Sequence, residues 1–470
     1  MTTPTTADAT GPGSPAPDPG PVPRRRVVSW ALWDWGSAAF NAVVTTFVFS
    51  TYLASGAFVD PAIVAAAGDD QRNPALVLAK AENATVVSGA LTIAGVLIAL
   101  LAPVLGQRSD GSGRRKAWLG VHTGLVVLAM VAMVAVAPTP SALVWGAALL
   151  AAGNLFFEFA SVNYNAMLVQ VSTRKTMGSV SGFGWGMGYV GGIVLLVLLL
   201  VAFLQSFGVD GRGGLLAVPT GTAGGAWDVR LSILVAAVWF AVFAVPVLLA
   251  VPEPPRTTRA SGRGGVLASY RVLGRTIAAL WRTNRQVLLF LAASAVFRDG
   301  LAAVFTFGAI IAAQVFGFSS AQVIYFAVAA NLVAGLGTFA GGWLDDRIGS
   351  KRVIVGALTG LVVASTAVLA IGTAQAAFWV VGLFLCLFVG PTQAASRTML
   401  ARVTPPGREG EIFGLYATTG RAVSFLAPGL FTLVVGATGD TRYGVIGIAA
   451  VLLAGLLLML PVKPVQRAID

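Results

Sequence analysis

The stretches GQRSDGSGRRK (residues 106–116) and GWLDDRIGSKR (residues 342–352) repeat one pattern at a distance of 236 residues. Each has a glycine, an aspartate four residues later, a second glycine three residues after that, and then basic residues. The aligned positions are Gly106 with Gly342, Asp110 with Asp346, and Gly113 with Gly349. A match of this kind at a constant offset predicts an internal duplication, in which the chain consists of two related halves.

The composition of the 470 residues places the chain in a membrane. Hydrophobic residues make up 56% and charged residues 11%, and the mean hydropathy is +0.82, which no water-soluble domain of this length would show. A helix needs about 20 apolar residues to cross a bilayer. Runs of that size are found at 28–54, 82–106, 117–137, 141–170, 179–204, 229–251, 286–313, 320–344, 353–372, 375–401, 412–437 and 443–462. The predicted fold is an all-α membrane protein with twelve transmembrane helices in two pseudo-symmetric six-helix bundles.

The basic residues predict the orientation, because Lys and Arg accumulate in cytoplasmic loops. With the N-terminus inside, 23 of the 31 Lys and Arg residues fall in cytoplasmic segments. We therefore expect a multi-pass protein with both termini cytoplasmic, and the net charge of +12 requires no nucleic-acid partner. The excess of arginine over lysine, with abundant Ala and Gly, is typical of a GC-rich bacterium and favours the plasma membrane.

Five segments follow from the spans and from the longest basic connection. The predicted segments are a disordered cytoplasmic tail at 1–26, an N-terminal six-helix bundle at 27–251, a cytoplasmic linker at 252–285, a C-terminal six-helix bundle at 286–463 and a cytoplasmic tail at 464–470. The first tail is rich in Pro, Gly and Thr and lacks the apolar core of a signal peptide. The middle of the linker could form an amphipathic helix on the membrane surface.

The two repeated loops predict contacts between the halves. A glycine lets two helices approach closely, an aspartate can bond a neighbouring arginine or the amides at a helix end, and the basic residues stay at the cytoplasmic surface. The alternative is a plain basic loop, but charge bias alone does not require this register of glycine and aspartate. The gating candidates in these loops are Gly106, Asp110, Arg114, Gly342, Asp346 and Arg347.

The loop pattern resembles the signature of the major facilitator superfamily. The second copy matches it fully, with Arg347 after Asp346, whereas the first copy has Gly111 at the corresponding place. Three further stretches resemble the unknown major facilitator family that is related to autophagy-linked vacuolar effluxers. They are WALWDWGSAAF from Trp30, GWGMGYVGG from Gly184 and GPTQAASRTMLARVTPPGREGEIFGLY from Gly390. The resemblance implies twelve helices in two halves and a transport function, and the eukaryotic relatives are linked to amino-acid efflux.

Ionisable residues inside the spans are the candidates for contact with substrate or coupling ion, because charge in the bilayer core is costly. At ~1.5 Å per residue, four of them lie near the midplane. They are Glu158, Arg298, Asp299 and Arg421. The amide candidates are Asn154, Asn165 and Asn41. Position favours a transport pathway, although the embedded acids and bases balance and would also suit structural ion pairs, and amides also join helices.

Asp34 lies near the start of the first span, roughly 12 Å from the basic residues that precede it. The neighbouring Trp30, Trp33 and Trp35 predict an aromatic belt at the membrane interface. Asp34 is therefore too shallow for a midplane ligand. We expect it to pair with a shallow base such as Arg397 and to close the inner mouth.

The predicted function is secondary transport of a small polar solute by alternating access. The resemblance implies an amino acid or a similar zwitterion as substrate and efflux as the direction, and protons are the candidate coupling ion. Sugars, small peptides and phosphate esters stay open as substrates. An exporter of amphipathic drugs or lipids is the alternative, but it would be expected to have an apolar cavity without the charges near the midplane.

An enzyme is not predicted, because the chain has no nucleophile and base cluster, one His and one Cys. We expect no metal, no cofactor and no nucleotide-driven pumping, since the phosphate-binding loop Gly-x-x-x-x-Gly-Lys-Ser/Thr is missing from the sequence. His122 lies in an apolar run and is interpreted as a packed core residue. The expected partners are the lipid bilayer and a small-molecule substrate, with the chain acting as a monomer.

Overall fold

The computed structural model describes residues 22–68, 70, 72–205, 211–253 and 266–463. Within this part the regular secondary structure is helical, apart from one short hairpin of β1 (Arg212–Gly213) and β2 (Val218–Pro219). Eleven helices of the described part are long and apolar enough to cross a membrane. The first predicted span adds a twelfth, which is divided into three helical pieces. The predicted fold class is confirmed.

The helices fall into two halves and one connecting helix. The N-terminal half contains α1 (Arg24–Ala38), η1 (Ala39–Phe47), α2 (Phe49–Leu53), η2 (Gly56–Phe58), α3 (Pro61–Ala67), α4 (Pro74–Ser112), α5 (Arg115–Met133), η3 (Pro140–Ala142), α6 (Leu143–Ala166), α7 (Leu168–Val171), α8 (Met177–Leu199), η4 (Leu200–Leu204) and α9 (Trp227–Ala250). The C-terminal half contains α11 (Arg285–Gln314), α12 (Ser320–Ile348), α13 (Ser350–Ala370), α14 (Gln375–Val403), α15 (Glu409–Ala422), α16 (Leu426–Thr438), η5 (Thr441–Tyr443) and α17 (Gly444–Met459). The connecting helix is α10 (Val266–Thr283).

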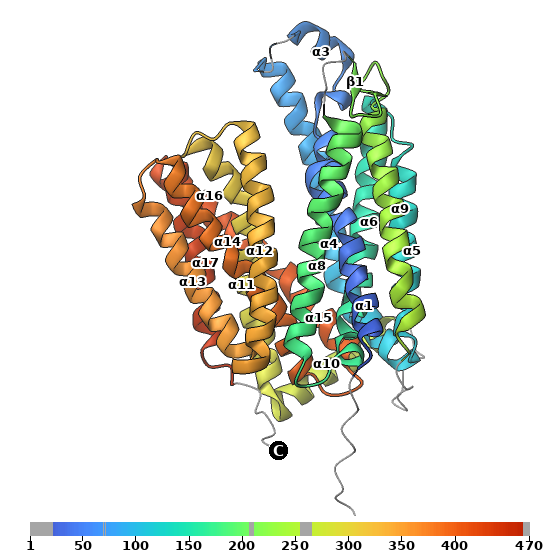
Figure 1. Ribbon diagram of the computed structural model, residues 1–470, viewed down its shortest axis with the longest axis vertical. Coiled ribbons are helices and arrows are strands. Elements are labelled where there is room, and N and C mark those ends of the chain that lie inside the picture. The colour runs from blue at the N-terminus through green and yellow to red at the C-terminus, as the bar shows by residue number, and fades with distance from the viewer. Residues whose placement is uncertain (1–21, 69, 71, 206–210, 254–265, 464–470) are drawn as a thin grey trace, which may run out of the picture.

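The two halves stand side by side (Figure 1). The N-terminal half runs from blue to yellow-green and the C-terminal half from amber to red. Helix α10 and the start of α15 lie at one end of the molecule, called here the lower end, whereas α3 and β1 lie at the other. The main contacts between the halves are made by α8 with α12 and by α4 with α15.

Local sequence explains where several helices begin and end. The side chain of Asn73 accepts hydrogen bonds from the amides of Ala75 and Leu76, and Pro74 occupies the first helical position, so α4 starts eight residues before the predicted span. Gly113 ends α4 in the left-handed conformation, with φ of 63°, and Gly349 ends α12 with φ of 92°. The second glycine of each repeated loop therefore supplies a backbone conformation that other residues adopt at a cost.

Two spans are interrupted. The hydroxyls of Thr45 and Thr46 both donate to the carbonyl of Asn41, at 2.6 and 2.8 Å, within the wide π-helical turns of η1. The eleventh predicted span breaks between α15 and α16, just before Pro428, whose ring lacks the N–H that would continue the ladder of helical hydrogen bonds.

The aromatic residues of the first helix form a core and do not face the interface. Trp30 and Trp33 are 0% and 1% exposed, and both rings stack on Tyr164, with centroids 4.5 and 4.3 Å away. The predicted interfacial belt is therefore wrong for these two residues, because α8 and α9 pack against α1 and Tyr164 of α6 covers both rings. Trp35 is partly buried and stacks on Trp239 of α9.

Helix α10 is the amphipathic helix that the basic linker predicts. Its buried side chains recur at the spacing of one helical face and are those of Ser269, Leu273, Thr276 and Leu280. The hydroxyl of Tyr270 donates to the carbonyl of Leu100 in α4, which ties α10 to the N-terminal half. Residues 254–265 of the predicted linker lie outside the described residues, so its full extent stays a prediction.

The predicted tails fall almost entirely on residues that the structure does not describe, 1–21 and 464–470. The exception is the end of the first tail, where Arg24, Arg25 and Arg26 already form the first turn of α1. That turn begins directly after Pro23, which is compatible with a position just before a helix.

Glycines bring the two halves into backbone contact. A methyl group added at Gly106 of α4 would overlap the carbonyl oxygen of Gly410 in α15. A methyl group at Gly342 of α12 would lie 2.6 Å from the carbonyl oxygen of Gly178 and 2.9 Å from Cα of Gly182, both in α8. The first glycine of each repeated loop thus touches the opposite half, as the register of the loops predicts.

We expect Gly106→Ala to destabilise the protein, because the added methyl group meets backbone atoms that cannot move aside as a side chain would. The expected cost is about 1–3 kcal/mol, measured by thermal unfolding in detergent. Gly95→Ala is the matched control on the same helix, since nothing lies within 4 Å of a methyl group there, and it should be neutral or slightly stabilising. Equal melting temperatures for the two variants would contradict this interpretation of the contact.

Candidate functional site

Asp34 and Arg397 lie together near the lower end and join the halves. A guanidinium nitrogen of Arg397 in α14 is 3.3 Å from Oδ2 of Asp34 in α1, and the two side chains are 4% and 15% exposed. The hydroxyl of Tyr164 donates to the same carboxylate oxygen at 2.8 Å. Arg397 also donates to Oδ1 of Asn165 at 3.2 Å, and to the hydroxyl and carbonyl of Ser181 at 3.0 and 2.6 Å. The pair expected from the sequence is present, and we call it the gate pair.

Aromatic rings surround the guanidinium of the gate pair. Its central carbon lies 4.8 Å from the ring centroid of Trp30, 5.5 Å from that of Trp185 and 5.7 Å from that of Tyr164. Cation–π attraction and the low dielectric of the rings both strengthen the interaction of Arg397 with its acceptors. An arginine enclosed in this way is costly to leave without its acidic partner.

Asp110 binds the N-terminus of a helix in the opposite half. Its carboxylate oxygens accept hydrogen bonds from the amides of Gly410, at 3.0 Å, and Glu411, at 2.8 Å, in the first turn of α15. Arg115 lies 2.6 Å from Asp110 and 2.5 Å from Glu409. A helix N-terminus carries partial positive charge and favours an anion. These five residues form the first latch.

Asp346 makes the corresponding contact in the other direction. Its two carboxylate oxygens accept from the amides of Gly178 and Ser179, each at 2.7 Å, in the first turn of α8. Arg402 of α14 lies 3.2 Å from Asp346 and 2.5 Å from Asp345. These five residues form the second latch. The first repeated loop therefore binds the N-terminal amides of the eleventh span, and the second binds those of the fifth span.

Two predicted members of the latches lie elsewhere. Arg114 is exposed, and its neighbour Arg115 makes the ion pairs of the first latch, because Arg115 begins α5 and is directed back toward Asp110. Arg347 is exposed on the last turn of α12 and stacks over Trp343, with its guanidinium carbon 3.7 Å from the ring centroid. Arg115 is adjacent to Arg114, the residue predicted for the first latch. No sequence pattern indicated Arg402, because its partners are remote along the chain.

A second group of charges lies farther from the lower end. The guanidinium of Arg421 is 3.3 Å from Glu158 Oε2 and 3.3 Å from Asn154 Oδ1. Arg421 follows the first latch by ten residues of α15, about 15 Å along the helix. Its side chain is 36% exposed and that of Glu158 is 20% exposed, so the pair is only partly buried. Three residues predicted separately are thus brought together across the halves.

Arg298 of α11 lies against the same end of α15. Its guanidinium carbon is 3.8 Å from the ring centroid of Tyr416, and one of its nitrogens donates to the carbonyl of Tyr416 at 3.0 Å. A methyl group at Gly420, the residue before Arg421, would lie 3.1 Å from that nitrogen. We refer to Asn154, Glu158, Arg298 and Arg421 as the central cluster.

Asp299 and Asn41 are not part of the central cluster. Asp299 is buried and accepts a hydrogen bond at 2.7 Å from the amide of Ala427, in the first turn of α16. It thereby stabilises the new helix that begins after the break in the eleventh span. Asn41 is exposed in η1, and Asn165, another predicted ligand, lies at the gate pair.

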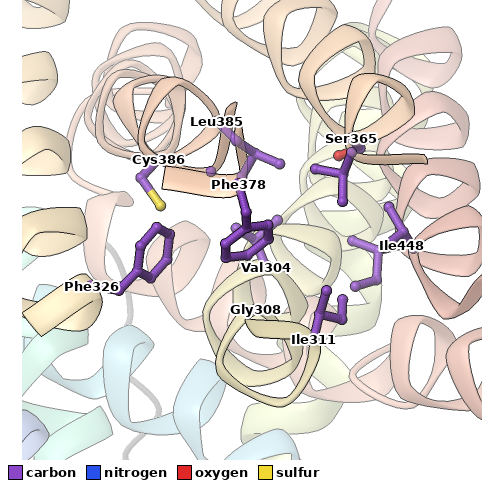
Figure 2. Close-up of a pocket in the computed structure, with 12 residues that line it drawn as sticks. Val304, Gly308, Ile311, Phe326, Ser365, Phe378, Leu385, Cys386 and Ile448 are labelled. Atoms are coloured by element: carbon purple, nitrogen blue, oxygen red, sulfur yellow. The ribbon is translucent and has the colours of Figure 1, made fainter. Parts of the chain in front are cut away.

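Two hollows in the described part of the chain have mainly apolar walls. Figure 2 shows a cavity of about 50 Å³ inside the C-terminal half, lined by side chains that include Phe326, Phe378 and Ile448, with the sulfur of Cys386 at its edge. A second hollow, of about 290 Å³, is lined by residues of η1, α2, η4 and α9. Neither touches the central cluster, so neither is a candidate for a polar solute.

Within the described residues, no group of three His, Cys, Asp or Glu side chains is placed to hold a metal ion. His122 is buried, and its Nδ1 lies 2.8 Å from the carbonyl oxygen of Trp118. Its ring also contacts Trp118 and Phe159. Its surroundings are those of a packed core residue.

The arrangement of the helices is that of known transporters. The proton:xylose symporter XylE superposes with a TM-score of 0.68 at 12% identity, covering 94% of this chain and 96% of that structure. The human organic anion transporter MFSD10 superposes with a TM-score of 0.62 at 17% identity, covering 93% and 99%. At these identities the likeness concerns the fold, which is that of the major facilitator superfamily.

The sequence comparisons narrow the class of this major facilitator transporter. The family model described as vacuole effluxer Atg22 like matches residues 169–469, and the chain belongs to that family. An uncharacterized MFS-type transporter of Bacillus subtilis, YxiO, is 26% identical over 434 residues, covering 92% of this chain and 93% of the relative. Autophagy-related protein 22-1 of Aspergillus fumigatus is 26% identical over 325 residues, covering 64% of this chain. The chain spans about half the length of that fungal relative, 49%.

We expect the gate pair to show strong energetic coupling. In a double-mutant cycle of Asp34→Asn, Arg397→Gln and the combined variant, each single change leaves a buried group without its partner, so the combined variant should lose less stability than the sum of both. The expected coupling is ~0.5–3 kcal/mol, measured by thermal or denaturant unfolding in detergent. Arg347→Gln serves as the control, because this exposed arginine stacks over Trp343 and takes no part in the gate pair. Strict additivity would mean that the two charges do not stabilise each other.

Proposed function

We propose that the chain is a secondary transporter that moves a small polar solute by alternating access between its two halves. The observation that carries the proposal is the central cluster, in which helices of both halves bring charged and amide side chains to one partly exposed place. In a membrane protein such groups are costly unless they serve a partner, a solute or an ion. Membership of a family described as vacuole effluxer supports export as the direction.

The contacts between the halves support a reversible closure at the lower end. The gate pair and both latches consist of ion pairs and hydrogen bonds, which water can replace when the halves separate. Aromatic stacks such as that of Trp30 and Trp33 on Tyr164 lie within one half, so a rocking motion would leave them intact. We expect the lower end to be cytoplasmic and the membrane to be the plasma membrane, with the chain acting as a monomer.

The substrate class that fits best is an amino acid or a similar zwitterion. An arginine can bind a carboxylate and a glutamate can bind an ammonium group, and both residue types are in the central cluster. An exporter of amphipathic drugs or lipids would need an apolar route between the halves, whereas the residues gathered there are charged.

Purified protein in liposomes should accumulate at least one radiolabelled amino acid in a counterflow assay, above the level of protein-free liposomes. Counterflow requires only alternating exposure of a binding site and no knowledge of the coupling ion. Efflux of apolar dyes, with no counterflow of any amino acid, would contradict the proposed substrate class.

We further expect the transport to be coupled to protons through Glu158, because a carboxylate that alternates between a proton and the guanidinium of Arg421 can link proton movement to conformation. Glu158→Gln should abolish accumulation driven by an imposed pH gradient while retaining counterflow. Glu82→Gln, an exposed position on α4, is the matched control. Gradient-driven accumulation that survives Glu158→Gln would exclude this residue as the coupling site.

A further inference from the structure

We propose that Arg298 is the anchor for a carboxylate of the transported solute, and that it makes a free carboxylate a requirement for binding. The inference rests on the proposed function and specifies which group of the solute the site recognises. It starts from the partners that the structure gives to each embedded arginine of the described chain.

Arg298 differs from the other two arginines within the predicted spans. Arg397 lies 3.3 Å from Asp34, and Arg421 lies 3.3 Å from Glu158. Among the described residues, no carboxylate lies within 4.0 Å of Arg298. The neighbouring Asp299 points about 100° away around α11 and binds the amide of Ala427.

The contacts of Arg298 hold the guanidinium without using all of its donors. The ring of Tyr416 supports it from one side, and a single N–H bonds the carbonyl of that residue. The guanidinium has five N–H donors in a fixed fork that matches a carboxylate. The side chain is partly exposed, and its other nitrogens are not among the buried unsatisfied atoms of the described chain. The fork is therefore fixed in place and open to a solute.

The charge of the central cluster points to the same solute group. The two arginines and one glutamate of the central cluster leave a net charge of one positive unit. Asn154 and Glu158 of α6, in the opposite half, contact Arg421 of this cluster. A solute carboxylate would neutralise this charge, whereas a neutral sugar would leave it uncompensated and a cation would increase it. A carboxylate bound to Arg298 would also be linked to the opposite half, because Arg421, which follows Gly420 on α15, pairs with Glu158 of α6.

Ligand-induced thermal shifts of the purified full-length protein test the proposal, using each L-amino acid and its carboxamide. At least one amino acid should raise the melting temperature, and its carboxamide, which lacks only the negative charge, should need at least a tenfold higher concentration. Arg298→Gln should abolish the response and Arg298→Lys should retain part of it. Arg275→Gln, which removes an exposed arginine from α10, is the matched control and should respond as the unaltered protein does.

The comparison of acid and amide uses the unaltered protein, so it decides the question even if Arg298→Gln fails to fold. Equal responses to acid and amide, or no response to any carboxylate, would overturn the anchor. Counterflow of a neutral solute that is unaffected by Arg298→Gln would overturn the anchor and leave the transporter proposal standing. If no solute of either kind shows counterflow or a thermal shift, both proposals fail.

Discussion

The contact on which the rest of the structure depends is a carboxylate bound to the first amides of a helix in the opposite half. Asp110 binds the start of α15 and Asp346 binds the start of α8. The bonded groups are backbone N–H groups that a helix cannot satisfy internally, and the helix end attracts the negative charge. These two contacts fix the approach of the halves, and the glycine contacts beside them become possible only at that distance.

The contacts within each half differ in kind from the ion pairs and hydrogen bonds that join the two halves. Within each half, helices pack through aromatic and aliphatic side chains, such as the stack of Trp30 and Trp33 on Tyr164. Between the halves, ion pairs, hydrogen bonds and glycine contacts occur together with one aromatic pair, Phe183 of α8 and Phe339 of α12. Apolar burial resists separation in proportion to the area exposed, whereas polar contacts exchange for water at a small net cost. Under the proposed alternating access, separation of the halves would exchange these polar contacts for water and would also part Phe183 from Phe339.

Much of the fold follows from the sequence, because twelve apolar runs and a duplicated loop are properties of single segments. The pairing of Asp34 with Arg397 was also predictable, since both lie at a similar shallow depth. The sequence did not decide which of two adjacent arginines pairs with Asp110. Arg115 makes the ion pair and Arg114 does not, and this choice depends on the turn at Gly113, which has the left-handed conformation. Arg402 and Glu409 could not be assigned, because their partners come from remote helices. Trp30 and Trp33 suggested an interface, yet neighbouring helices enclose them.

The duplicated loops also bear on how a protein with two related halves can diverge. In both copies the aspartate contacts backbone amides, but the cation beside it comes from α5 in one copy and from α14 in the other. A backbone N–H is present whichever side chain a position carries. The amide donor therefore does not depend on side-chain identity, although a side chain at Gly410 or Gly178 would collide with the aspartate bound there. A side-chain cation, in contrast, can be replaced by another from a different helix. The two loops thus share the same aspartate–amide contacts, and they differ in the side chains that surround these contacts.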